Sequence, residues 1–108
     1  MEWQDLNETK QLDQIIEQSK SKPVAIFKHS TTCGISRMVY KNLAKELEAR
    51  NDIQTEVYYL DLKQYRSVSN LVADQLKVVH ESPQLIIIEN GLVTHDSSHY
   101  SIDSSVIK

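Results

Sequence analysis

A short and continuously apolar run, Val-Ala-Ile-Phe over residues 24–27, constrains the fold of this chain more than any other feature. Proline precedes the run at position 23, where it ends any earlier helix because it removes a backbone donor and disfavours helical geometry in its predecessor. A run of this length and composition is typical of a strand that is buried on both faces. The sequence therefore predicts a covered sheet with this strand inside it.

The stretch His-Ser-Thr-Thr-Cys-Gly-Ile-Ser, residues 29–36, follows the run and contains the only cysteine, Cys33. Residues 19–45 carry six Lys or Arg side chains and no acid, although the whole chain has 15 acids and 12 bases. Positive surroundings and a helix N-terminus favour the thiolate, which is the nucleophilic form of cysteine. A buried structural cysteine is the alternative, but the loop position and the flanking hydroxyls favour a nucleophile.

The rest of the chain alternates between amphipathic and apolar segments. Helical spacing of apolar residues predicts helices over residues 9–19, 35–50 and 67–77, the last with Ser67 as its N-cap. Apolar runs predict strands over 56–61, 84–88 and 92–95, with Asn90-Gly91 as a hairpin turn between the last two. A short helix is expected over 103–108. Helical crossovers make the first two strands parallel, and the turn makes the last two antiparallel.

Length and composition exclude several classes of protein. At 108 residues the chain fits one domain, which we expect to span residues 1–108. The net charge of −3 argues against nucleic acid as a partner. A lone thiol, an acidic N-terminus without a signal-like run, and the lack of a continuous apolar segment of roughly 18 residues predict a cytoplasmic protein without a membrane partner.

A reactive cysteine between the first strand and its helix, with proline before a later strand, is the layout of a thioredoxin-like α/β fold. We expect a glutaredoxin-type mixed sheet of four strands flanked by helices, with an extra N-terminal helix. Residues 22–33, Ile35-Ser36, Ser82-Pro83-Gln84 and Ser98-His99-Tyr100 resemble the monothiol bacilliredoxins of the YtxJ/BrxC type. The resemblance spans nearly the whole chain.

The resemblance implies an enzyme, a thiol-disulfide oxidoreductase that removes bacillithiol from mixed disulfides on other proteins. Bacillithiol, a cysteinyl-glucosaminyl-malate thiol, would be a co-substrate, and no tightly bound cofactor or metal is implied. The partners would be bacillithiolated client proteins and, as reductant, a low-molecular-weight thiol or another redoxin. The resemblance also implies that the Ser82-Pro83 bond is cis and exposes backbone for pairing with an extended substrate.

The residue types in the sequence and the family resemblance together predict the residues of the active site. Cys33 is the expected nucleophile, and Ser36, which replaces the second cysteine of two-thiol enzymes, is expected to be a hydroxyl donor to it. The expected substrate contacts are Thr32, Gly34, Lys28, Ser82, Pro83, Ser98 and His99. His29 could shuttle protons or simply pack in the structure.

Gly34 departs from the resemblance, because family members often have proline after the cysteine. Glycine there resembles the Cys-Gly-Phe-Ser of monothiol glutaredoxins, some of which carry iron–sulfur clusters. An iron–sulfur carrier therefore stays open as an alternative, although the chain lacks the Lys-Gly-Thr approach of those proteins. A thioredoxin-like adaptor whose cysteine senses redox state is the third possibility.

Overall fold

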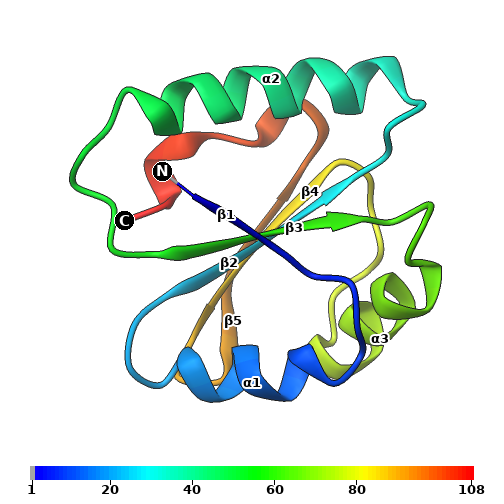
Figure 1. Cartoon of the computed structure of the whole chain (residues 1–108), viewed down its shortest axis with the longest axis vertical. Helices are drawn as coiled ribbons and strands as arrows, with labels where there is room; N and C mark the ends of the chain where they lie inside the picture. Colours follow the sequence, from blue (N-terminus) through cyan, green and yellow to red (C-terminus); the bar gives the residue numbers. More distant parts are fainter. Residues whose placement is uncertain (1) are drawn as a thin grey trace.

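The apolar run predicted to be a strand is the middle strand of a sheet that lies between two helical layers (Figure 1). The computed structural model describes residues 2–108, and these form five strands in the order β1-β3-β2-β4-β5. The strands are β1 Trp3–Asp5, β2 Val24–His29, β3 Glu56–Asp61, β4 Gln84–Glu89 and β5 Leu92–Ser98. The helices are α1 Gln11–Gln18, α2 Gly34–Glu48 and α3 Arg66–Leu76.

Strand directions agree with the prediction. β2 runs parallel to β3 and antiparallel to β4, and β4 pairs antiparallel with β5. Asn90 and Gly91 join β4 and β5 with φ angles of 54° and 78°, the left-handed region that a two-residue hairpin turn of this type requires at both positions. The α/β thioredoxin-like architecture and the extra N-terminal helix are thus confirmed.

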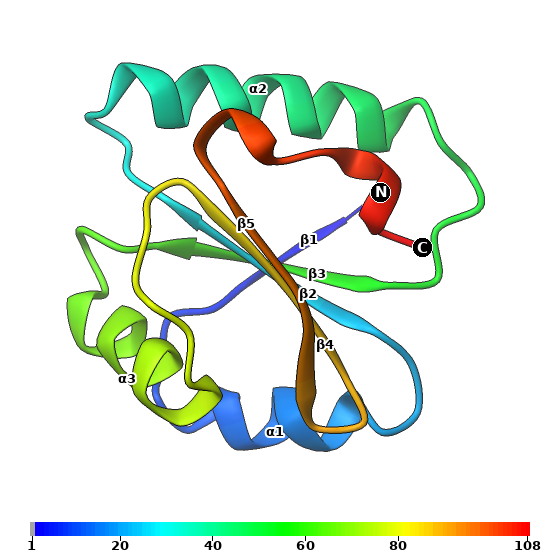
Figure 2. The ribbon, with the colours of Figure 1, turned by 180° about the vertical axis from the view of Figure 1, so that it is seen from behind.

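Alternation along β2 divides the core between the two faces of the sheet. Val24 and Ile26 pack against α1 and α3, while Ala25 and Phe27 pack against α2, and all four side chains are fully buried. Figure 2 shows the C-terminal segment running beside α2 on the same side of the sheet. Ile107 anchors that segment, because its side chain is buried in the core cluster under α2.

Three details of the prediction are wrong. The sheet has a fifth strand, β1, which pairs parallel with β3; a three-residue edge strand is too short to show a periodic pattern. Helix α3 begins at Arg66 with Tyr65 as N-cap, in place of Ser67. The expected helix over 103–108 is a short 3₁₀ turn at Ser104–Val106, preceded by another at His99–Ser101.

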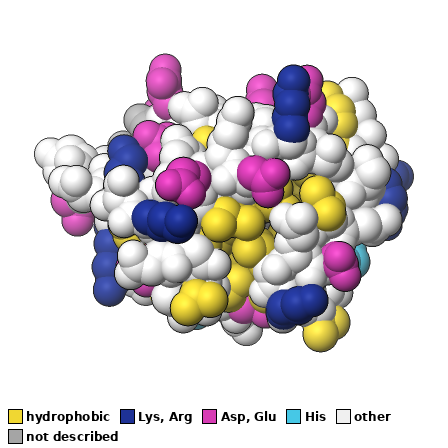
Figure 3. All heavy atoms as spheres, turned by 90° about the horizontal axis from the view of Figure 1, so that it is seen from below, with side chains coloured by type: hydrophobic (Ala, Val, Ile, Leu, Met, Phe, Trp, Pro, Cys, Tyr) yellow, Lys and Arg dark blue, Asp and Glu magenta, His cyan; other side chains and the backbone are white. Residues whose placement is uncertain are grey.

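The face seen from below in Figure 3 carries hydrophobic side chains in its centre and charged side chains of both signs around them. Positive and negative groups alternate on this face, so it offers no continuous basic surface. Among the described residues, no helix has the length and hydropathy needed to cross a membrane.

Candidate active site

Cys33 lies between β2 and α2, as predicted, and it is the N-cap residue of α2. Its backbone is extended (φ −95°, ψ 124°), and the helix begins at Gly34. The side chain is partly exposed, and the Cys33 carbonyl accepts the first helical hydrogen bond, from the Arg37 amide at 3.0 Å. Within residues 2–108 the cap position makes no side-chain hydrogen bond, so the sulfur does not accept from the amides of Ile35 and Ser36. The sulfur is left available to a reagent.

The Ser36 side chain is fully buried and makes two hydrogen bonds on the side of the sheet that α2 covers. The Ser30 amide donates to Ser36 Oγ at 3.0 Å, and His29 Nδ1 lies 2.8 Å from the same oxygen. Neither partner is the sulfur of Cys33. Ser36 therefore ties the end of β2 to the first turn of α2, and its predicted role as a hydroxyl donor to the thiol is not what this geometry shows.

Lys28 does not reach the site as expected. Alternation along β2 directs its side chain to the face covered by α1 and α3, where it is fully buried. Its ammonium donates to the Ser69 carbonyl and to His80 Nδ1, each at 3.1 Å. Burial lowers the pKa of Lys28 to about 8, against a smaller opposing effect of the Asp96 carboxylate. A side chain with no exposed surface cannot contact a substrate in this conformation.

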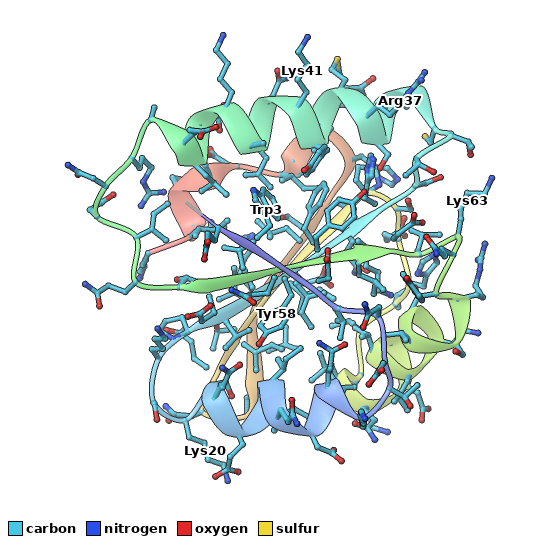
Figure 4. All side chains as sticks on the ribbon, in the orientation of Figure 1. Trp3, Lys20, Arg37, Lys41, Tyr58 and Lys63 are labelled. Atoms are coloured by element: carbon cyan, nitrogen blue, oxygen red, sulfur yellow. The ribbon has the colours of Figure 1, made fainter. Side chains whose placement is uncertain are left out.

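The basic stretch of the sequence disperses in the folded protein. Figure 4 shows Lys20 and Lys41 at opposite sides of the molecule, and Arg37 and Lys63 near the end of the sheet that carries the cysteine loop. Lys63 Nζ donates to Thr32 Oγ1 at 2.9 Å, directly beside Cys33. Sequence reasoning missed Lys63, although it follows β3, and the carboxyl ends of parallel strands meet at the same edge of a sheet.

The Ser82-Pro83 peptide bond is cis, as the resemblance implied. The pairing of Lys28 with Gln84 places this turn beside the residues that follow β2, at the end of the sheet where the cysteine loop begins. Ser98 pairs with Gln84, and the His99 amide donates to the Pro83 carbonyl at 3.0 Å. Cysteine loop, proline turn and the end of β5 therefore share one end of the sheet.

Two side-chain oxygens near the proline turn have no hydrogen-bond partner among the described residues. They are the buried Oγ atoms of Ser82 and Ser97. His99 is exposed, has a φ of 55°, and lies 3.6 Å from a carboxylate oxygen of Glu81. It also lines a cavity of about 120 Å³ against α2. Polar groups for a ligand are thus present beside the turn.

Gly34 occupies the first position of α2, and a Cβ atom added there would meet no other atom within 4 Å. Neither close packing nor a positive φ requires glycine at this position. Proline is also well suited to the first position of a helix. The departure from the family pattern at Gly34 is therefore sterically neutral in this structure.

Two histidines have lowered pKa values, His29 beside the cysteine loop and His80 beside Lys28. Burial lowers the pKa of His29, and the Asp61 carboxylate opposes this shift more than the Arg37 guanidinium adds to it. Burial also lowers the pKa of His80, and the adjacent Lys28 ammonium lowers it further. Both imidazoles thus take up protons less readily in the folded chain than in the unfolded chain.

We expect the free energy of unfolding to fall as the pH drops from 7 to 5.5. The unfolded chain binds protons at its histidines below their ordinary pKa of 6.5, whereas folded His29 and His80, whose pKa values are lowered, bind protons less readily, so acid favours unfolding. The free energy of unfolding can change by at most about 1.4 kcal/mol per pH unit for each proton that the unfolded chain binds and the folded chain does not. Urea titrations followed by Trp3 fluorescence would measure it, and the His29→Asn variant should show a shallower slope. A flat dependence in the native protein would contradict this expectation.

Among residues 2–108, no three His, Cys, Asp or Glu side chains lie together in a way that could hold a metal ion. The geometry instead presents one accessible thiol at a helix N-terminus, with cationic side chains and a proline turn beside it. Such an arrangement suits nucleophilic attack on a disulfide.

Comparison with known proteins agrees with this chemistry. Residues 4–107 match the family model described as monothiol bacilliredoxin BrxC. A solved structure presented as a candidate oxidoreductase with a thioredoxin fold is 35% identical in sequence to this chain. The alignment covers 94% of this chain and 87% of the other chain, and the two structures superpose with a TM-score of 0.80.

Thioredoxins share the fold at lower identity. The thioredoxin of Malassezia sympodialis has 18% identity, covers 97% of this chain and 84% of its own, and gives a TM-score of 0.73. The thioredoxin of Schistosoma mansoni has 20% identity, covers 92% and 87%, and gives 0.69.

Proposed function

Because the chain belongs to the monothiol bacilliredoxin BrxC family, and is thus a thiol oxidoreductase, we propose that it removes bacillithiol from mixed disulfides on other proteins. The observation that carries this proposal is the position of its only cysteine. Cys33 caps α2 with a partly exposed side chain, at the end of the sheet where the cis-proline turn lies. A thiol that is exposed in this way can attack a disulfide, and the thiolate is the form that does so.

The reaction is a thiol-disulfide exchange in two steps. The Cys33 thiolate attacks the bacillithiol sulfur of the client's mixed disulfide, which forms a Cys33–bacillithiol disulfide and releases the client thiolate. No second cysteine exists in the chain to resolve this disulfide. A second low-molecular-weight thiol or another redoxin then attacks it, regenerates the Cys33 thiolate and leaves with the bacillithiol. This cycle needs a reducing compartment, which supports the cytoplasm as its location.

The surroundings of Cys33 suit the polar and anionic groups of bacillithiol. Lys63 donates a hydrogen bond to Thr32, the residue that precedes Cys33. Its positive charge would attract the malate carboxylates. The exposed side chain of His99, beside the proline turn, is a further polar group that could bond to hydroxyls of the sugar. Lys63 thus replaces the buried Lys28 as the proposed cationic contact, while Thr32, Gly34, Ser82, Pro83, Ser98 and His99 stay predicted contacts.

Mass spectrometry of a single-turnover mixture tests the proposal. Native protein mixed with a bacillithiolated client in the absence of reductant should gain one bacillithiol on Cys33, and the client should regain its thiol in equal amount. The control is native protein whose Cys33 has first been alkylated with iodoacetamide, which should leave the client modified. Transfer from a glutathionylated client at the same rate would contradict the choice of bacillithiol. No transfer from either client would contradict the oxidoreductase cycle.

A further inference from the structure

A continuous set of hydrogen bonds connects the side chain of His29 with the backbone of Cys33. His29 Nδ1 lies 2.8 Å from Ser36 Oγ, and Ser36 Oγ accepts from the Ser30 amide at 3.0 Å. The Ser30 carbonyl in turn accepts from the Cys33 amide at 3.2 Å. Ser30 is therefore held at both backbone groups, by Ser36 on one side and by Cys33 on the other. The turn over residues 30–33 depends on this set.

Counting donors and acceptors gives the direction of the bond between His29 and Ser36. Ser36 Oγ already accepts a hydrogen bond from the Ser30 amide. Among residues 2–108, the acceptor within reach of its hydroxyl hydrogen is His29 Nδ1. Ser36 is fully buried, so its hydroxyl would find no water if it turned away from His29. The His29 side chain is 4% exposed. An unpaired buried donor is costly. The neutral imidazole that carries its proton on Nε2 and accepts from Ser36 at Nδ1 therefore pairs the buried hydroxyl of Ser36.

Aromatic side chains hold the His29 ring in place. Its centroid lies 5.0 Å from that of Tyr40 and 5.7 Å from that of Tyr59, and it stacks on Phe27 at 6.1 Å and an interplanar angle of 21°. Packed on three rings, the imidazole presents Nδ1 to Ser36 in a fixed direction. A histidine that only filled space in this cluster would not need its nitrogen at hydrogen-bond distance from a buried hydroxyl.

We propose that His29 is a positioning residue for Cys33, which holds Ser36 through Nδ1 and thereby fixes the turn that keeps the thiol at the start of α2. His29 does not touch the reacting sulfur. It acts through Ser36 and the Ser30 backbone, and it keeps the side chain of Cys33 at the start of α2. Ser36 is then the link in this arrangement, which accounts for its burial. The proposal concerns the reactivity of the thiol, and it deepens the proposed function without assuming bacillithiol.

Alkylation of Cys33 by iodoacetamide at pH 7.5 tests the proposal without any bacillithiol. Removing the bond in His29→Ala or Ser36→Ala should slow alkylation about tenfold, which corresponds to one hydrogen bond of ordinary net strength. His29→Asn should retain the native rate within about threefold, because its amide oxygen can take the place of Nδ1. His29→Gln, whose amide reaches the place of Nε2, should resemble His29→Ala. His95→Asn is the matched control on β5 and should leave the rate unchanged.

Nuclear magnetic resonance of the imidazole nitrogens gives a second readout, which applies even where a variant folds poorly. At pH 7.5 Nδ1 of His29 should be unprotonated and hydrogen-bonded, with the proton on Nε2. A proton on Nδ1 would overturn the proposal. It would also be overturned if folded His29→Ala reacted at the native rate, or if His29→Gln matched His29→Asn. Failure of bacillithiol transfer with these rates unchanged would count against the proposed function alone.

Discussion

Replacing Cys33 with serine is expected to reduce the transfer of bacillithiol from a client protein to the background rate. The chain has no other thiol, and a serine hydroxyl cannot form the mixed disulfide that the cycle requires. The substitution changes one atom at a partly exposed helix cap, where serine is a favourable N-cap residue. Stability should therefore be kept or slightly increased, so loss of transfer would report the chemistry of the sulfur.

Mass spectrometry of the client over time is the measurement, with thermal unfolding as the test that the variant is folded. Transfer by the Cys33→Ser variant at the native rate would refute the cycle. The same variant separates the alternatives. An iron–sulfur carrier predicts that anaerobic reconstitution with iron and sulfide gives a coloured dimer with the native protein and none with the variant. An adaptor with a sensing cysteine predicts that the native protein is modified by oxidants but does not release bacillithiol from a client.

Much of the fold could be predicted because its signals are local. The apolar run of β2 allowed one interpretation, since proline bounds it and an amphipathic segment follows. The Asn90-Gly91 turn set the direction of β5, because a two-residue turn with positive φ at both positions admits only a hairpin. Those signals also placed Cys33 at the start of α2. A three-residue strand such as β1 has no periodicity of its own, and its pairing with β3 depends on tertiary structure.

The side chains of the site were harder to predict, because their partners are distant in sequence. Lys63 reaches Thr32 from the loop after β3, across 31 positions of sequence. Ser36 was expected to face Cys33, its neighbour on the helix, yet it turns toward His29 and the Ser30 amide. Side chains alternate along β2, so the sequence did predict that Lys28 and His29 lie on opposite faces of the sheet. The sequence did not show that α3 and His80 would bury the Lys28 ammonium.

Replacing Lys28 with methionine is expected to stabilise the protein by about 1–3 kcal/mol at pH 7. Lys28 has no exposed surface, and burial lowers its pKa from 10.5 to about 8. A shift of this size corresponds to roughly 3 kcal/mol against the charged form. Methionine keeps the volume and removes the charge. The Ser69 carbonyl and His80 lose a donor, which reduces the gain, but Ser69 Oγ lies 3.5 Å from His80 Nδ1 and can donate in its place.

The advantage of methionine should shrink as the pH rises. Between pH 8 and 10.5 the unfolded chain keeps a proton on Lys28 that the folded chain has lost, so native stability increases with pH in this range. Above pH 10 the raised pKa values of Tyr58 and Tyr59 act in the opposite direction, because the folded chain then holds protons that the unfolded chain releases. These tyrosines are common to both proteins, so their effect cancels in the difference between variant and native protein.

Urea titrations of native and variant protein at pH 7, 8.5 and 9.5 measure this difference directly. Lys41→Met is the matched control, since Lys41 is exposed on α2 and its ammonium points to solvent (Figure 4). That substitution should change stability by less than about 0.5 kcal/mol at every pH. A Lys28→Met variant less stable than the native protein at pH 7 would show that the bonds to Ser69 and His80 outweigh the desolvation of the ammonium. An advantage that stayed constant from pH 7 to 9.5 would show that Lys28 titrates in the fold as it does in water.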